Sequence, residues 1–153
     1  MMILIPAFLI GLFCGLRSLT APAVTAWAAH LGWLRLEGHL SLIGTWPSVM
    51  IFTLVALVEL VADKLPQTPS RTAAPGLIAR ILMGALTGAC VSSAGGQGIF
   101  GALMGALGGM VGCFGGYWTR ARAVKVIGTH DLNVALIEDL IAVGGSVWVV
   151  ASV

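Results

Sequence analysis

The sequence predicts an all-α fold: a polytopic bundle of membrane-crossing helices that forms a single domain over residues 1–153. Of the 153 residues, 58% are hydrophobic and only 9% are charged, and the mean hydropathy is +1.01. A soluble domain has about a quarter of its residues charged, so this chain has too few polar groups to cover a globule in water. We therefore expect the lipid bilayer to be its surroundings.

Six apolar runs lie along the chain, and we expect about six membrane crossings. A helix needs roughly 20 residues to cross the hydrocarbon core of a bilayer. Four runs reach or approach this length, and they cover residues 46–61, 76–94, 99–118 and 132–153. Two shorter runs, 2–16 and 18–34, come first and are separated by Arg17. A re-entrant hairpin, broken at the sequence GLRSLTAP with Arg17 at membrane depth, is the alternative for these two.

The distribution of Lys and Arg predicts the orientation, because the loops on the cytoplasmic side hold the excess. If all six runs cross, only Arg35 lies on the outer side. The other basic residues fall on the opposite side, and they are Arg17, Lys64, Arg71, Arg80, Arg120, Arg122 and Lys125. We therefore expect a multi-pass protein of a bacterial inner membrane, with both termini outside.

The sequence gives no support to several classes of function. The net charge is only +2, and the basic residues are spread between apolar runs, so we expect no nucleic-acid partner. The three cysteines, Cys14, Cys90 and Cys113, have no metal-ligand spacing and are expected to be packing residues. No HExxH or Gly-x-Ser-x-Gly motif occurs. We expect no metal, no cofactor and no catalytic residues, and we leave enzymatic activity open as the less favoured case.

Glycines recur at helical spacing in two neighbouring runs. In lipid, helices associate where small residues let their backbones approach closely. Steps of four and three keep the glycines of the run 99–118 on one helix face. The predicted helix-packing positions are Gly84, Gly88, Gly101, Gly105, Gly108, Gly112 and Gly115. This face favours packing within the chain, and it is also a candidate seam for the homodimer that we expect.

Charged residues from distant parts of the chain gather near the predicted inner ends of the helices. Ionisable residues at membrane depth are costly and usually mark a pathway or a site. The candidate substrate- or ion-binding residues are Arg17, Glu59, Asp63, Lys64, Arg71, Arg80, Glu138 and Asp139. Glu59 and Asp63 are the candidates for binding a proton or cation, and Arg17 and Arg80 are the candidate anion contacts or counter-charges. A set of ion pairs that clamps the helices together is the alternative.

Three functions are compatible with these features. The leading hypothesis is a small transporter or channel-like protein with a polar site open to the cytoplasm, for a small ion or small molecule whose identity the sequence does not give. The alternatives are a membrane enzyme that acts on a lipid head group and a non-catalytic structural or assembly subunit.

Four motifs resemble a family of small bacterial integral membrane proteins catalogued only as a domain of unknown function. They are GLRSLTAP, VELVADKLPQTPSR, GAxxG in the fourth run and NVALIEDLIA in the last. The resemblance covers residues from about 10 to 150. It implies that the family pattern includes Gly15, Arg17, Glu59, Asp63, Lys64, Pro66, Glu138 and Asp139, and it implies no activity.

Overall fold

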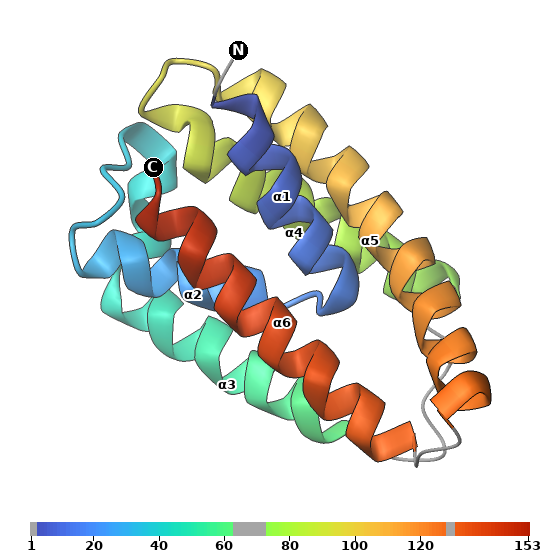
Figure 1. Cartoon of the computed structure of the whole chain (residues 1–153). Helices are drawn as coiled ribbons and strands as arrows, with labels where there is room; N and C mark the ends of the chain where they lie inside the picture. The colour runs from blue at the N-terminus through green and yellow to red at the C-terminus, as the bar shows by residue number, and fades with distance from the viewer. Residues whose placement is uncertain (1–2, 63–72, 128–130) are drawn as a thin grey trace.

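The computed structural model of the chain describes residues 3–62, 73–127 and 131–153, and this part is helical apart from short turns (Figure 1). In chain order the helices are α1 (Leu4–Leu16), α2 (Thr20–His30), the 3-10 helix η1 (Gly38–Gly44), α3 (Trp46–Ala62), α4 (Ala74–Ser93), α5 (Gly98–Ile127) and α6 (Asp131–Ala151). Every predicted apolar run corresponds to a helix. The main difference is α5, which continues nine residues beyond Trp118, the predicted end of its run.

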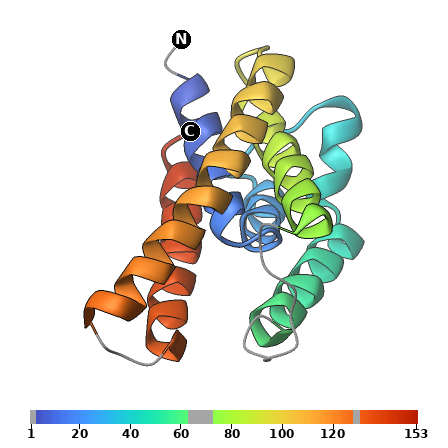
Figure 2. The same cartoon turned by 90° about the vertical axis from the view of Figure 1, so that its right-hand side faces the viewer.

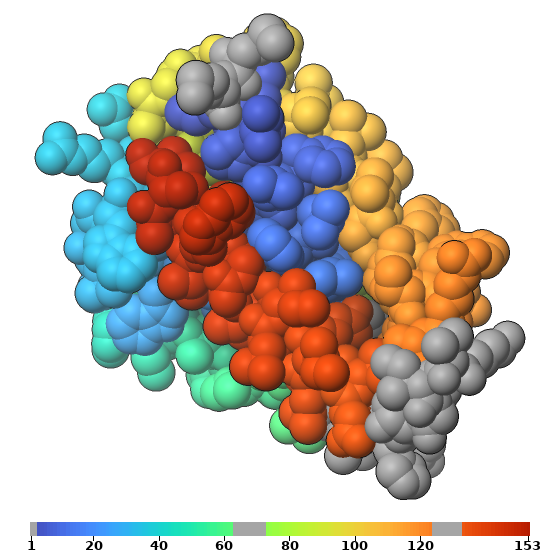
Figure 3. Space-filling model, viewed as in Figure 1, coloured from blue at the N-terminus to red at the C-terminus, as the bar shows by residue number. Residues whose placement is uncertain are grey.

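The helices form one bundle in which α1 lies at the centre. α5 packs along both α1 and α4, while α6 covers α1 and α2 from the other side. Figure 3 shows the surface of α1 between α6 and α5. α3 packs mainly against α2 and η1, and most of its side chains are exposed. The start of α1 and the end of α6 lie at the end of the bundle opposite the C-terminal end of α5 (Figure 1).

Three of the described helices, α4, α5 and α6, are long and apolar enough to cross a membrane. A fourth span is present if η1 and α3, which meet at a bend of 61°, are counted together. α1 has 13 residues and α2 has 11, so their lengths are roughly 20 Å and 17 Å, below the ~30 Å of a hydrocarbon core. The expected six crossings are therefore not confirmed.

α1 and α2 form a pair of short helices inside the bundle, with a break between them at Arg17. Figure 2 shows both blue helices in the upper and middle part of the molecule, whereas α3, α5 and α6 extend to its lower end. The chain leaves helical geometry at Arg17, whose backbone is extended with φ −139° and ψ 114°. The side chain of Arg17 is 0% exposed, so the break lies in the interior.

Glycines make the contact between α4 and α5 possible. A Cβ atom on Gly105 would collide with the carbonyl oxygen of Gly84, and one on Gly88 would collide with that of Gly101. Gly109, which was not among the predicted positions, meets the carbonyl oxygen of Arg80 at 2.6 Å from an ideal Cβ. Because these obstacles are backbone atoms, they cannot rotate away. The two helix backbones therefore touch directly.

A second glycine contact joins α5 to α1. A Cβ atom on Gly108 would collide with the carbonyl oxygen of Phe8, and one on Gly112 would collide with that of Leu12. On the α1 side, an ideal Cβ on Gly15 would lie 2.5 Å from the Gly112 Cα atom. The glycines of α5 are thus covered by α1 and α4, except that nothing lies within 4 Å of a Cβ on Gly115. The part of this face between residues 101 and 112 is not available to a second copy of the chain.

Candidate functional site

The break between α1 and α2 exposes backbone groups that need partners. The last carbonyl groups of a helix and the first N–H groups of the next have no partner within their own helix. In an apolar interior each unsatisfied group costs several kcal/mol. Three charged side chains from other helices supply hydrogen bonds at this break, and they are Glu59 of α3, Arg80 of α4 and Asp139 of α6.

Glu59 binds the start of α2. Its Oε1 atom accepts hydrogen bonds from the backbone N–H of Ser18 at 2.9 Å and from the Ser18 hydroxyl at 2.5 Å. Its Oε2 atom accepts one from the backbone N–H of Leu19 at 2.9 Å. The carboxylate therefore caps α2 from outside the helix, where the partial positive charge of the N-terminus stabilises an anion.

Arg80 binds the end of α1. Its Nε atom donates to the carbonyl oxygen of Gly15 at 3.1 Å, and its Nη1 atom donates to the carbonyl oxygen of Gly76 at 2.9 Å. The side chain is buried, with 4% exposed. A cation at a helix C-terminus is favourable because the unpaired carbonyl groups there carry partial negative charge. Arg80 and Glu59 thus bind the two helix ends at the break with opposite charges.

Arg17 and Asp139 form a buried ion pair next to the break. The Arg17 Nε atom donates to Asp139 Oδ1 at 2.6 Å, and the Nη2 atom of the same guanidinium contacts the same oxygen. The Nη1 atom donates to the backbone carbonyl oxygen of Glu59 at 3.3 Å. Arg17 is the residue with the extended backbone, and its side chain therefore connects the break to both α3 and α6.

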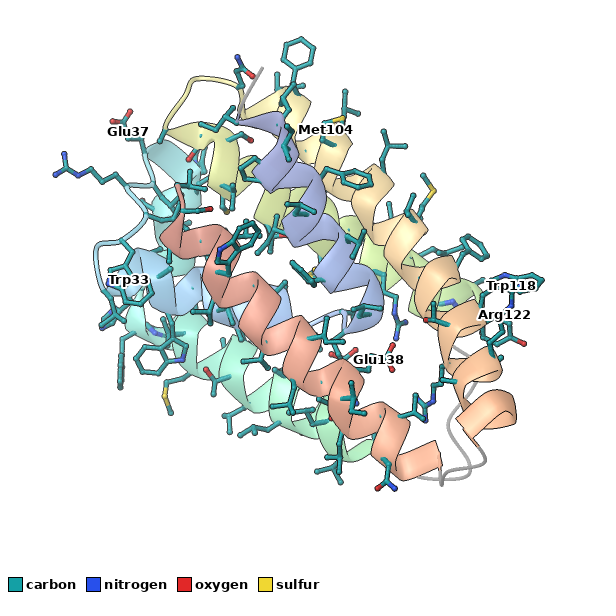
Figure 4. All side chains as sticks on the ribbon, viewed as in Figure 1. Trp33, Glu37, Met104, Trp118, Arg122 and Glu138 are labelled. Atoms are coloured by element: carbon teal, nitrogen blue, oxygen red, sulfur yellow. The ribbon has the colours of Figure 1, made fainter. Side chains whose placement is uncertain are left out.

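Glu138, the neighbour of Asp139 on α6, lines a pocket beside the break. This pocket has a volume of about 170 Å³ and lies between α5, α6 and the end of α1. Arg120 of α5 lines the same pocket, and its Nη1 atom lies 3.7 Å from Glu138 Oε2. Figure 4 shows Glu138 directed toward the inside of the molecule, whereas Trp118 and Arg122 point outward from α5.

Four of the eight candidate site residues meet at the break: Arg17, Glu59, Arg80 and Asp139. Glu138 lines the neighbouring pocket between α5, α6 and the end of α1. Asp63, Lys64 and Arg71 lie outside the described residues. The reasoning from sequence missed Ser18, whose hydroxyl and N–H bind Glu59. It also treated Arg120 only as a cytoplasmic charge, because Arg120 lies just beyond residue 118, the predicted end of its run.

Within the part of the chain that the structure describes, no group of three or more His, Cys, Asp or Glu side chains is arranged to hold a metal ion. Cys14, Cys90 and Cys113 are buried. His30 lies at the end of α2 that is away from the break. Its ring centroid is 5.2 Å from that of Trp46 and 6.2 Å from that of Trp27.

The fold and the buried charges define a class: a multi-pass helical membrane protein with a broken helix pair in its interior. The chain belongs to the family described as Domain of unknown function (DUF4126), whose model matches residues 4–152. No curated protein and no solved structure matches the chain.

Proposed function

We propose that the protein is a small transporter or channel-like protein of a bacterial inner membrane, with its binding centre at the α1–α2 break. The observation that carries this proposal is the meeting of Arg17, Glu59, Arg80 and Asp139 at two buried helix ends. Discontinuous helices whose ends face a polar centre are a recurring arrangement in secondary transporters, because the freed backbone groups and the helix dipoles bind ions and substrates.

Glu59 is the candidate for the ion-binding group. It is half-buried, whereas the other three charged side chains at the break are buried, so it is the most accessible of the four. A proton or cation bound to its carboxylate weakens the hydrogen bonds that it accepts from Ser18 and Leu19. Binding would therefore destabilise the N-terminus of α2. A ligand that does this favours an arrangement of the break in which Glu59 no longer holds Ser18 and Leu19 over the arrangement in which it does.

Flux into liposomes tests this proposal. The purified protein is reconstituted into vesicles that contain a pH-sensitive dye, and proton flux is driven by a potassium diffusion potential. We expect the parent protein to dissipate the imposed gradient faster than protein-free vesicles do. We expect Glu59→Gln to lose most of this rate, because the amide cannot take up a proton.

Glu37→Gln is the matched control, because Glu37 is exposed and lies outside the break. Its flux should equal that of the parent. A parent rate no higher than that of empty vesicles contradicts the proposal for protons. Parent-like flux in Glu59→Gln, with the fold intact by circular dichroism, contradicts the role of Glu59.

A structural clamp is the second candidate, favoured by a specific observation: Glu59 and Arg80 both bind backbone groups that the break exposes. Such a clamp needs no ligand. It predicts that Glu59→Gln lowers the free energy of unfolding without changing any flux. The same two variants, measured for stability as well as flux, therefore separate the two functions.

A further inference from the structure

We propose that the pocket between α5, α6 and the end of α1 binds the head group of a phospholipid that carries both a phosphate and a protonated primary amine. The pocket is lined by Leu16, Gly116, Thr119, Arg120, Ala123, Val134, Ile137, Glu138 and Ile141. Arg120 and Glu138 are the charged residues among them. The proposal does not depend on transport, because Glu59, the candidate ion-binding group, is not among the residues that line this pocket.

The two charges of the pocket match the two charges of such a head group. A guanidinium binds phosphate oxygens through paired N–H donors, and a carboxylate accepts hydrogen bonds from an ammonium group. The Arg120 Nη1 and Glu138 Oε2 atoms are 3.7 Å apart, which is longer than the 2.7–3.2 Å usual for a protein N–H···O hydrogen bond. Their side chains are 19% and 9% exposed. Both side chains are therefore largely desolvated, and their opposite charges lie side by side in the pocket at the distance of an ion pair.

The position and lining of the pocket favour a lipid over a water-soluble ligand. Ile137 and Ile141 line the pocket and are also among the exposed apolar side chains of α6, so its wall continues into the outer surface. On α5, Tyr117 and Trp118 are exposed close to Arg120, and such aromatic residues are typical of the boundary between lipid head groups and acyl chains.

The size of the pocket agrees with a head group whose acyl chains stay outside. A pocket that encloses a whole drug-sized molecule has a volume of roughly 300–1,000 Å³, and this one has about 170 Å³. A head group would occupy the charged interior, while the chains would lie along the exposed surface of Ile137 and Ile141. The structure thus assigns the site to a zwitterionic lipid rather than to a free metabolite.

Native mass spectrometry of the detergent-purified protein measures this binding directly. The titrants are phosphatidylethanolamine, phosphatidylcholine and phosphatidylglycerol with identical acyl chains. We expect phosphatidylethanolamine to bind about tenfold more tightly than phosphatidylcholine, because the quaternary amine of phosphatidylcholine has no N–H to donate to Glu138. Phosphatidylglycerol lacks the amine and should also bind more weakly.

Three substitutions assign the preference to the pocket. Glu138→Gln should bring the affinities for phosphatidylethanolamine and phosphatidylcholine close together, and Arg120→Gln should weaken both. Arg122→Gln is the matched control, because Arg122 is an exposed arginine on the same helix that points away from the pocket (Figure 4). Ala123→Leu narrows the pocket with both charges kept, and it should lower the affinity for phosphatidylethanolamine even if Glu138→Gln fails to fold.

Two results would overturn the proposal. Equal binding of the three lipids by the parent protein shows that the pocket does not recognise the amine. Equal loss in Arg122→Gln and Arg120→Gln shows that general positive charge at this end of α5, rather than the pocket, attracts the lipid.

Discussion

At the scale of single residues, the charged side chains at the break bind backbone atoms as well as one another. Glu59 accepts from two backbone N–H groups, and Arg80 donates to two backbone carbonyl groups. Burying an isolated charge in an apolar interior is unfavourable. Here Glu59 is offset by the N–H groups of Ser18 and Leu19, and Arg80 by the carbonyl group of Gly15, all of which the break would otherwise leave without these partners. The charges and the break therefore stabilise each other.

The sequence identified most of these residues but not their partners. Arg17, Glu59 and Asp139 were predicted as site residues because charged residues are rare in this chain. Their partners include the N–H groups of residues 18 and 19, which become available only because the helix stops at Leu16. Nothing in the spacing of Glu59 along α3 indicates that it reaches a turn about 40 positions earlier, since that contact depends on how the helices pack.

The Arg17–Asp139 ion pair gives a prediction at this scale. Arg17→Gln or Asp139→Asn removes one member of this buried ion pair, a change that typically costs about 3–5 kcal/mol. The double variant removes both charges, so its loss should be smaller than the sum of the two single losses. Unfolding in mixed detergent and SDS micelles measures the free energy of unfolding of the parent, the two single variants and the double variant.

The comparison of the single and double variants can also contradict the ion pair. If the losses of the two single variants simply add in the double variant, the two side chains are not coupled in the folded protein. The pairing of Arg17 Nε with Asp139 Oδ1 would then not describe the protein in its micelle.

At the scale of elements, α5 uses its glycines on two neighbours. The spacing predicted one small face, and the structure divides that face between α4, which meets Gly101, Gly105 and Gly109, and α1, which meets Gly108 and Gly112. The helical period places all of these residues within one broad stripe. It does not reveal whether one helix or two cover the stripe, because that depends on where the short α1 inserts.

This division predicts unequal effects of two identical substitutions. Gly105→Ala places a methyl group against the backbone of Gly84, and overpacking of this kind costs about 1–3 kcal/mol. Gly115→Ala meets open space, and it should leave stability unchanged or raise it by up to ~1 kcal/mol because alanine favours the helix. The unfolding assay in mixed micelles compares the two.

The Gly115 variant also serves as the control for changed helix propensity on α5. Equal stability of the two variants would mean that the α4–α5 backbones do not touch at Gly105. A gain in stability for Gly105→Ala would argue against this packing even more strongly.

At the scale of the whole molecule, composition predicted the helices better than the path of the chain through the membrane. Each apolar run is a helix, but α1 and α2 are shorter than the roughly 20 residues of a usual span, so the six crossings are not confirmed. Their lengths were already at the lower limit in the sequence. The hydropathy of a short run does not distinguish a thin crossing from half of a broken pair, because both are equally apolar.

Thiol labelling tests the buried break. We expect a membrane-impermeant maleimide to label His39→Cys from one side of the membrane and Arg122→Cys from the other. Leu19→Cys should react from neither side until SDS is added, because the break lies inside the bundle. Cys14, Cys90 and Cys113 are buried and should not contribute a background in the folded protein.

The competing topology gives a different pattern of labelling. If residues 2–34 cross the membrane twice, positions 17–19 form an aqueous loop on the side of Arg122. Rapid labelling of Leu19→Cys from that side would therefore establish two crossings and contradict the broken pair.

The central place of α1 has a consequence for biogenesis. α1 leaves the ribosome before α5, yet the glycine surfaces that hold it belong to α5, which begins only at Gly98. A 13-residue segment is too short to be retained by its own partitioning into lipid. α1 must therefore wait, shielded by the insertion machinery or at the bilayer surface, until the α4–α5 hairpin has been synthesised and can pack against it.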